Sequence, residues 1–458
     1  VSSRSQTDLS TQLSRNISLN IPLISANMDT VTEAPMAVTI AREGGIGIIH
    51  RFLTIQEEVN EVLKVKRSGS VMIENPYSVN LEQTIQDAFS IMSEKEVSGL
   101  LVVDSNSKLT GILTERDVLF EPDNCSKLVK ELMTKDVVTA KPGIDLEEAK
   151  QILKKNRIEK LPIIDDNHLI KGLITSQDIS NLEKYPNASK DSKGRPIVGA
   201  AVGVKGDFLE RTEALLDAGT DVIVVDIAHG HSENAITTVK NIKKAFPNCE
   251  LIAGNVATAK GTEDLISAGV DAVKVGVGSG SICITRVITG SGVPQLTAVL
   301  DCAKVGKQHG VPIISDGGTR NSGDATKALA AGASSIMIGS IFGGTDETPG
   351  TTITKNNKRF KIYRGMASLA ASMGRKTKDG GTLEITDDLN DYVAEGVEAM
   401  VPYKGSVTDI ITQVTGGIRS GLSYCGAHSI EQMHKNAEFI KISRAGFAES
   451  QPHDVDVM

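Results

Sequence analysis

A glycine-rich stretch that ends in a cysteine and a threonine contains the residue types in this sequence best suited to covalent chemistry. It runs from Lys274 to Arg286 as KVGVGSGSICITR and follows a short apolar run. Glycines let backbone groups approach a ligand closely, and a cysteine is nucleophilic even when only a small fraction is thiolate. Cys283 is therefore the candidate nucleophile. The other four cysteines are better interpreted as small apolar core residues: Cys125, Cys249, Cys302 and Cys425.

The composition limits the classes of protein to consider. The 458 residues are 40% hydrophobic and 23% charged, which is typical of a globular chain of about three domains or of one large domain with an insert. With 49 Lys and Arg against 57 Asp and Glu, the net charge of −8 disfavours nucleic-acid binding. Apolar runs are far shorter than the ~20 residues of a membrane span, and no signal-peptide pattern opens the chain. Five cysteines without a Cys-x-x-Cys pair predict neither disulfides nor zinc, and favour a cytoplasmic protein.

One unit recurs in the second half of the chain: a helix, then Ala-Gly, then a β-branched run. In its three copies, the Ala-Gly pair stands at residues 218–219, 268–269 and 331–332. Glycine suits the left-handed residue that ends a helix, and a continuous β-branched run suits a strand buried on both faces. The repetition predicts βα units.

Counting such runs gives eight predicted strands, and eight strands alternating with helices predict an α/β fold, a (β/α)₈ TIM barrel. The candidate nucleophile then follows the sixth strand, on the face where barrels carry their reactive residues. A doubly wound parallel sheet is the alternative. The predicted strands are residues 21–26, 45–49, 197–202, 222–227, 251–255, 272–276, 312–316 and 335–339.

Residues 71–186 interrupt the barrel pattern and repeat internally. Residues 101–118 and 162–179 each read strand, strand, Thr-x-x-Asp, helix. These residues predict an inserted α+β domain, with residues 1–70 and 187–458 forming the barrel. At a helix start, the Thr and Asp of this motif can also be ordinary helix caps.

The paired repeats resemble the tandem CBS, or Bateman, module. In that module the Thr and Asp commonly hold a nucleotide ribose. The resemblance implies a regulatory site for purine nucleotides such as ATP, GTP or GDP, formed by Thr114, Asp117, Thr175 and Asp178.

Residues 278–286 are similar to the catalytic loop of the IMP dehydrogenase/GMP reductase family. Further segments follow in the order of that family, so the resemblance covers nearly the whole chain: residues 25–33, 225–232, 253–256, 315–318 and 363–366. It implies that Cys283 attacks C2 of a purine nucleotide to form a covalent intermediate, and that a nicotinamide cofactor exchanges a hydride with that carbon. Homotetramers that pair into octamers are also implied.

Glycine-rich turns after the seventh and eighth strands suit a nucleotide phosphate, because they offer backbone N–H groups. By resemblance, the catalytic residues are Cys283, Thr285 and Glu395. Asp226 and Asn255 are implied to bind the cofactor, and the carbonyls of Gly278, Gly280 and Cys283 a potassium ion. We assign no metal to His229 or His231. The implied substrate-binding residues are Ser25, Met28, Asn255, Ser281, Asp316, Gly318, Gly339, Ser340, Tyr363, Gly365 and Met366.

The direction of the reaction depends on a flap that carries an adjacent Arg-Tyr pair in dehydrogenases. Gly380-Gly381 stands at that place here, and glycine offers neither a proton acceptor nor a cation. This favours GMP reductase, which converts GMP and NADPH to IMP, ammonia and NADP. The alternative is IMP dehydrogenase, which converts IMP, NAD and water to XMP and NADH, with Arg375 or a Thr285–Glu395 relay activating water. A barrel that only senses nucleotides is disfavoured by the intact Cys-x-Thr sequence.

Overall fold

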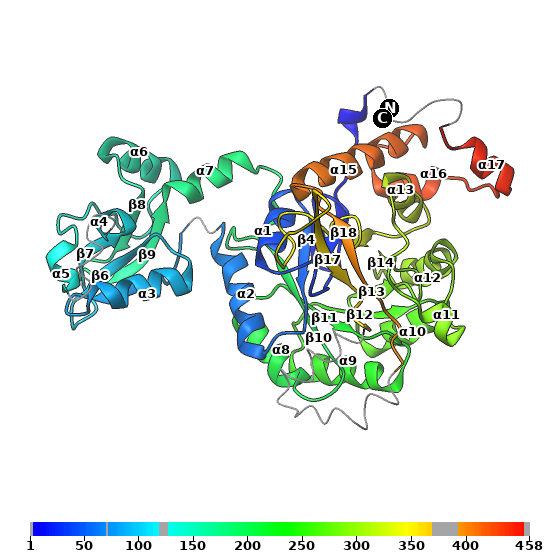
Figure 1. Ribbon diagram of the computed structural model, residues 1–458, viewed down its shortest axis with the longest axis horizontal. Helices are drawn as coiled ribbons and strands as arrows, with labels where there is room; N and C mark the ends of the chain where they lie inside the picture. Colours follow the sequence, from blue (N-terminus) through cyan, green and yellow to red (C-terminus); the bar gives the residue numbers. More distant parts are fainter. Residues whose placement is uncertain (1–2, 70–71, 119–126, 369–392, 453–458) are drawn as a thin grey trace.

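The computed structural model describes residues 3–69, 72–118, 127–368 and 393–452. Eight parallel strands close into a barrel in the order β10-β11-β12-β13-β14-β15-β3-β4. Figure 1 shows this barrel with helices around it and the insert to one side. The barrel strands are β3 (Leu23–Ser25), β4 (Ile46–Ile49), β10 (Val198–Val202), β11 (Val222–Asp226), β12 (Leu251–Val256), β13 (Ala272–Val275), β14 (Ile313–Asp316) and β15 (Ser335–Ile338).

All eight predicted strands are confirmed, each with its ends within two residues of the prediction. The doubly wound alternative is wrong, because β3 and β4 pair with each other and with β15 and β10, which closes the sheet. Val222, Ile223, Val224 and Val225 are fully buried, since alternate side chains point into the barrel and toward the helices. The continuous β-branched runs follow from this burial on both faces.

The helices around the barrel follow the strands, as expected for βα units. Gly269 ends one of them in a left-handed conformation with a φ of 109°. Gly219 and Gly332 also have positive φ, at 92° and 108°, which accounts for the recurring Ala-Gly. These helices are α1 (Ala34–Arg42), α2 (Ile55–Arg67), α8 (Phe208–Asp217), α9 (Glu233–Ala245), α10 (Ala259–Ala268), α12 (Gln295–His309), α13 (Ser322–Ala330) and α15 (Val407–Tyr424).

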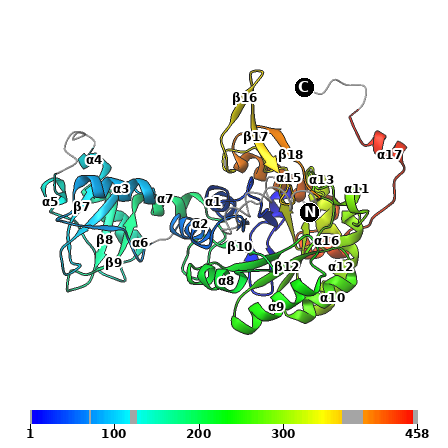
Figure 2. The same ribbon diagram turned by 60° about the horizontal axis from the view of Figure 1, so that its bottom comes forward.

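An antiparallel sheet, which was not among the predicted elements, follows the eighth barrel strand. Figure 2 shows its β16–β17 hairpin standing away from the barrel. The sheet consists of β16 (Ile353–Lys355), β17 (Lys358–Arg364) and β18 (Glu398–Pro402). The remaining elements outside the insert are η1 (Arg4–Gln6), β1 (Thr11–Gln12), β2 (Ser18–Leu19), α11 (Thr285–Thr289), α16 (Ile430–Asn436) and α17 (Arg444–Glu449). Within the described ranges, no helix is both long and apolar enough to cross a membrane.

The insert forms two small α/β halves, each with its own apolar core. Each half contains an antiparallel strand pair followed by a helix, as the sequence repeat predicted. The boundaries at residues 71 and 186 and the identification as a Bateman module remain predictions. The elements are β5 (Ser78–Asn80), α3 (Ile85–Lys95), β6 (Gly99–Val103), β7 (Leu109–Thr114), α4 (Glu115–Val118), α5 (Val129–Leu132), α6 (Leu146–Asn156), β8 (Lys160–Ile164), β9 (Ile170–Thr175) and α7 (Ser176–Lys184).

The barrel should fold without the insert, because both ends of the insert are held by the same barrel helix. Arg42 donates a 3.0 Å hydrogen bond to the Ser68 carbonyl, and the Ser189 amide donates one of 2.8 Å to the Ala41 carbonyl. We expect a chain in which a short Gly-Ser linker replaces residues 71–186 to unfold cooperatively within about 4 °C of the full chain, as measured by circular dichroism. A chain lacking α9, which covers the barrel, serves as a control that should not fold. Aggregation of the insert deletion would contradict the prediction.

Candidate functional site

The candidate nucleophile lies on the loop between β13 and α11, at the carboxyl end of the barrel strands. Its sulfur is 3.1 Å from the Thr285 hydroxyl oxygen, which in turn donates a 2.7 Å hydrogen bond to Oε2 of Glu395. The three predicted catalytic residues therefore form one chain of contacts from a thiol to a carboxylate. Such a chain can carry a proton away from the sulfur and return it.

Glu395 reaches the loop through backbone pairing. The Ile284 amide donates a 2.9 Å hydrogen bond to the Glu395 carbonyl, and the Val397 amide donates one of 3.1 Å to the Ile282 carbonyl. Gly396 lies between these bonds, where a Cβ would be 3.1 Å from the Ser368 amide nitrogen. The short segment before β18 thus acts as an extra strand that positions the carboxylate.

Cys283 differs from the other described cysteines in the surroundings of its thiol. Burial raises the pKa of Cys249 to about 12 and that of Cys302 to about 11, so neither forms a thiolate readily. Cys283 is partly exposed on the catalytic face. Cys425 is also partly exposed, but it follows α15 on the outside of the barrel, and Cys125 lies outside the described residues.

The mouth of the barrel contains a charged cluster around a buried lysine, Lys274 of β13. Its Nζ donates 2.8 Å hydrogen bonds to Oδ1 of Asp226 and Oδ2 of Asp316, and also bonds Oδ1 of Asn255. Asn255 Nδ2 donates a 2.9 Å hydrogen bond to Asp316. Three predicted ligand-binding residues thus meet at one cation. Lys274 had no role among the predicted site residues, although a lysine inside an apolar strand is a usable signal.

The charges in this cluster stabilise one another. Burial alone would raise the pKa of Asp226, but Lys274 outweighs it, so the pKa of this carboxyl lies below its ordinary value. For Lys274, burial acts to lower the pKa, and the two carboxylates raise it above the ordinary value. The lysine is therefore charged.

A second group of predicted substrate residues meets at the start of the turn after β15. A Cβ at Gly339 would lie 2.9 Å from the Tyr363 hydroxyl and 3.0 Å from the Met28 sulfur, so glycine permits this approach. Burial raises the pKa of Tyr363 to about 12, which keeps its hydroxyl protonated, although an interaction with the Ser281 side chain acts in the opposite direction. The arrangement offers hydroxyl donors near the catalytic loop.

The other predicted substrate residues lie in different surroundings. Gly318 is exposed with a φ of 78°, and the Ser340 carbonyl accepts a 2.8 Å hydrogen bond from Lys404. Gly365 is buried and its amide donates to the Val397 carbonyl, with Met366 next to it. Ser25 is fully buried, and its hydroxyl accepts a 2.9 Å hydrogen bond from Thr32.

The predicted potassium ligands belong to the catalytic loop itself. The Gly280 carbonyl accepts a 3.1 Å hydrogen bond from the Cys283 amide, and Gly278 has a φ of 77°. The described residues contain no group of three His, Cys, Asp or Glu side chains that could hold a metal ion. His231 is paired with Asp264 at 2.7 Å.

In both halves of the insert, the predicted regulatory residues adopt the same geometry. Asp117 Oδ2 accepts hydrogen bonds from the Thr114 amide and hydroxyl, at 2.7 and 2.9 Å. Asp178 Oδ2 accepts the equivalent bonds from Thr175 at 3.2 and 2.5 Å. These bonds occur at the starts of α4 and α7, so the helix-cap interpretation fits, and nucleotide binding remains a prediction.

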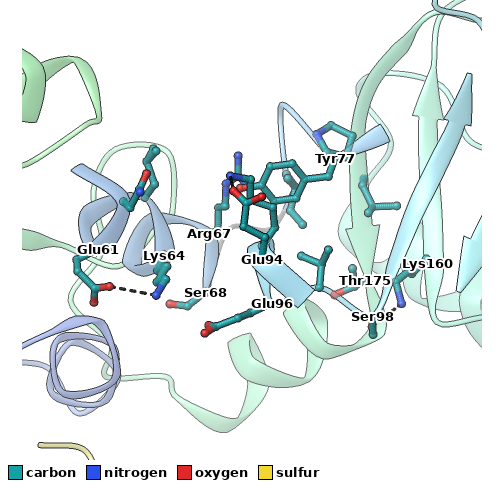
Figure 3. A pocket seen from close by; sticks show the side chains of 18 of the residues that line it. Glu61, Lys64, Arg67, Ser68, Tyr77, Glu94, Glu96, Ser98, Lys160 and Thr175 are labelled. Atoms are coloured by element: carbon teal, nitrogen blue, oxygen red, sulfur yellow. Dashed lines mark hydrogen bonds and ion pairs between the residues drawn. The ribbon is translucent and has the colours of Figure 1, made fainter. Parts of the chain in front are cut away.

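A cleft of about 710 Å³ separates α2 of the barrel from the insert. Thr175 and Lys160 line its insert side, as Figure 3 shows. The Arg67 guanidinium lies 3.9 Å from the centre of the Tyr77 ring. The cleft thus combines an aromatic ring stacked by a guanidinium with charged side chains of both signs.

Comparisons with known proteins agree with the resemblance seen in the sequence. The model of the family described as "IMP dehydrogenase / GMP reductase domain" matches residues 1–453. The chain is 76% identical over 458 residues to inosine-5'-monophosphate dehydrogenase of Nitrosopumilus maritimus. This match covers 100% of this chain and 96% of that protein. It is 52% identical to the same enzyme of Aquifex aeolicus, over 99% of this chain and 92% of that protein.

The solved structures include GMP reductase from Trypanosoma brucei. A cysteine-to-alanine variant in complex with guanosine 5'-monophosphate matches with a TM-score of 0.91 and 44% identity, over 100% of this chain and 95% of that chain. The same enzyme in complex with guanosine 5'-triphosphate matches with a TM-score of 0.79 and 41% identity, over 97% and 94%. With these relatives and a family model that spans almost its whole length, the chain belongs to the IMP dehydrogenase/GMP reductase family.

Proposed function

We propose that the protein catalyses oxidation or reduction at C2 of a purine nucleotide through a covalent bond between C2 and the Cys283 sulfur. The observation that carries this proposal is the chain of contacts from Cys283 through Thr285 to Glu395. Loss of the thiol proton along this chain gives the thiolate that attacks C2. The same groups can later take a proton from water or give one to a departing amine.

The activity that we propose is that of IMP dehydrogenase, in which IMP, NAD and water give XMP and NADH. The relatives that are 76% and 52% identical over nearly the whole chain bear this name. This direction needs hydrolysis of the covalent adduct, in which water adds to C2, the C2–sulfur bond breaks and the water loses a proton. The Glu395 carboxylate can accept this proton through the Thr285 hydroxyl, which is hydrogen-bonded to it.

GMP reductase is the second candidate, because Gly380 and Gly381 replace the pair that activates water in dehydrogenases. These two residues and Arg375 lie outside the described residues. The Trypanosoma brucei enzymes that match over the whole chain are named GMP reductase. In this direction Cys283 displaces ammonia from GMP, the Thr285–Glu395 pair protonates the leaving amine, and NADPH is the reductant.

The described residues fit a nicotinamide cofactor, a group that the family uses to accept or deliver the hydride. Asp226 is the last residue of β11, and its side chain is partly exposed. Its carboxylate can accept hydrogen bonds from ribose hydroxyls. We also propose that K⁺ binds the carbonyls of Gly278, Gly280 and Cys283. The Gly280 carbonyl, which accepts one hydrogen bond, retains a second lone pair for this purpose.

The first prediction decides the direction of the reaction. With IMP and NAD, with and without K⁺, we expect absorbance at 340 nm to rise well beyond one equivalent of active sites, with XMP as the product, because the relay allows the adduct to hydrolyse. A single burst with IMP, together with NADPH loss and ammonia release on addition of GMP, would establish the reductase instead. Inactivity with both nucleotides would refute the proposed chemistry.

The second prediction concerns the nucleophile and its relay. Cys283→Ala should bind nucleotide and form no covalent adduct, whereas Cys425→Ala should react like the parent because its thiol lies away from the barrel mouth. Glu395→Gln should form the adduct and release it about 100-fold more slowly, since proton acceptance is lost. Intact-protein mass spectrometry after acid quench measures the adduct. Turnover by Cys283→Ala above a few per cent of the parent would disprove the assignment.

We propose that the insert is a Bateman module that binds purine nucleotides such as ATP, GTP or GDP, and that the chain assembles into tetramers and octamers. The matched Thr-Asp pairs support nucleotide binding, because each Asp carboxylate has a second oxygen that does not cap the helix. The match to a GMP reductase in complex with guanosine 5'-triphosphate also supports this proposal.

The third functional prediction tests this regulatory site by calorimetry of GTP, GDP and ATP with the full chain. Asp178→Ala should weaken binding by about 10-fold, because a charged hydrogen-bond acceptor is removed. Asp166→Ala is the matched control, since Asp166 pairs only with Lys141 on the surface in the described contacts. Unchanged affinity in Asp178→Ala, or no heat from any of the three nucleotides, would reject the site.

A further inference from the structure

Two buried lysines of this protein each bridge two aspartates, and they lie at opposite ends of the barrel. Lys66 of α2 contacts Asp191 at 3.0 Å and Asp221 at 2.6 Å, and Asp221 directly precedes β11. This first group is therefore at the amino end of the strands. Lys274 forms the second group at the carboxyl end. In barrels of this type the amino end serves stability and the carboxyl end carries the chemistry.

Lys274 cannot itself contact a ligand, but its partners can. Its side chain is 2% exposed, whereas those of Asp226 and Asp316 are 20% and 21% exposed. The lysine thus lies beneath two carboxylates that open toward the barrel mouth. Each carboxylate gives one oxygen to the lysine at 2.8 Å and has a second oxygen for other partners.

We propose that Lys274 is a positioning residue that holds Asp226 and Asp316 together and thereby couples nucleotide binding to cofactor binding. This inference rests on the proposed function and on the family resemblance, which implies that Asp316 binds the ribose of the nucleotide and that Asp226 binds the nicotinamide riboside. Asn255 braces the lysine against one of the two carboxylates, because it accepts a hydrogen bond from Lys274 and donates one of 2.9 Å to Asp316.

The physical reason is charge repulsion within a confined space. Two carboxylate oxygens that share one nitrogen partner cannot be farther apart than twice 2.8 Å, and without the cation they repel each other. Arg51 and Asn27 also act to lower the pKa of Asp226, and Asp316 interacts electrostatically with Tyr363. Lys274 contacts both carboxylates directly, at 2.8 Å each.

Lys274→Met tests the proposal with a side chain of similar length and no charge. The KM values for the purine nucleotide and for the nicotinamide cofactor should both rise, each by about 10- to 100-fold, as for other residues that orient ligand-binding groups. Because Lys274 lowers the pKa of Asp226, its loss should raise that pKa. The acid side of the activity profile should therefore move to higher pH. Unchanged KM values and an unchanged profile would overturn the proposal.

Lys66→Met is the matched control, since it removes the same charge from an equally buried bridge. It should lower the unfolding temperature and leave both KM values and the pH profile as in the parent. Lys274→Arg retains the charge, so it should keep the acid side of the profile at the position of the parent. If the acid side of the profile moves to higher pH as far in Lys66→Met as in Lys274→Met, the change reflects general destabilisation. That outcome would contradict a positioning role for Lys274.

A second measurement applies even if Lys274→Met does not fold. In the Cys283→Ala background, which blocks chemistry, GMP and IMP affinity is measured by calorimetry without cofactor, before and after Asp226→Asn. If Lys274 couples the two carboxylates, the loss of charge at Asp226 should change nucleotide affinity by at least about threefold. The reason is that the Lys274 ammonium group then interacts more strongly with Asp316. No change would refute the coupling. The activity of the parent chain tests the proposed function separately, so the two failures are distinguishable.

Discussion

Pairing between residues 395–397 and the catalytic loop is the interaction on which the reactive geometry depends. Backbone hydrogen bonds from Ile284 to Glu395 and from Val397 to Ile282 fix this segment beside the loop. The Glu395 carboxylate then meets the Thr285 hydroxyl at 2.7 Å, although 110 residues separate them in the chain. A backbone ladder sets side-chain positions more tightly than contacts between flexible loops do, because each pair of bonds fixes register. The proton relay is thus built into backbone structure.

The second constraint comes from the barrel interior, which limits the positions at which a charged side chain can be buried. Its interior is apolar, so a lysine on β13 is tolerated only because carboxylates and an amide surround its nitrogen. One lysine between two aspartates leaves a net negative charge and carboxylate oxygens directed outward. Ribose hydroxyls are suitable donors to such oxygens. The side chains that stabilise the buried cation are therefore the same ones that we propose to bind the two riboses.

The barrel could be predicted from the sequence, because strands buried on both faces appear as continuous β-branched runs such as Val222–Val225, and helix ends appear as Ala-Gly. The catalytic trio could be named only through family resemblance, since nothing local to Glu395 signals its partner. The role of Lys274 could not be predicted from the apolar pattern of its strand, because its two carboxylate partners lie on other strands of the barrel. The β16–β18 sheet was missed for another reason: its partly exposed strands pair across a long insertion, and their pattern lacks the burial that marked the barrel. The hydrogen bond from Thr32 to the buried Ser25 hydroxyl is likewise a contact that strand prediction does not reveal.

Side chains that line the cleft beside the insert also contact residues of the barrel. No local sequence pattern predicts these contacts, because they join residues from different helices and strands. Helix α2 forms one wall of the cleft beside the insert, and Glu33, at the start of α1, also lines that cleft. Glu33 Oε1 is 3.1 Å from Nε2 of His50, a buried residue directly after β4 at the carboxyl end of the barrel. Glu61 of α2 accepts a 2.7 Å hydrogen bond from the Ala34 amide, which joins the two helices at the same point. Glu33 and Glu61 therefore line the cleft beside the insert and also make contacts within the barrel, so a molecule that fills the cleft would lie against both carboxylates.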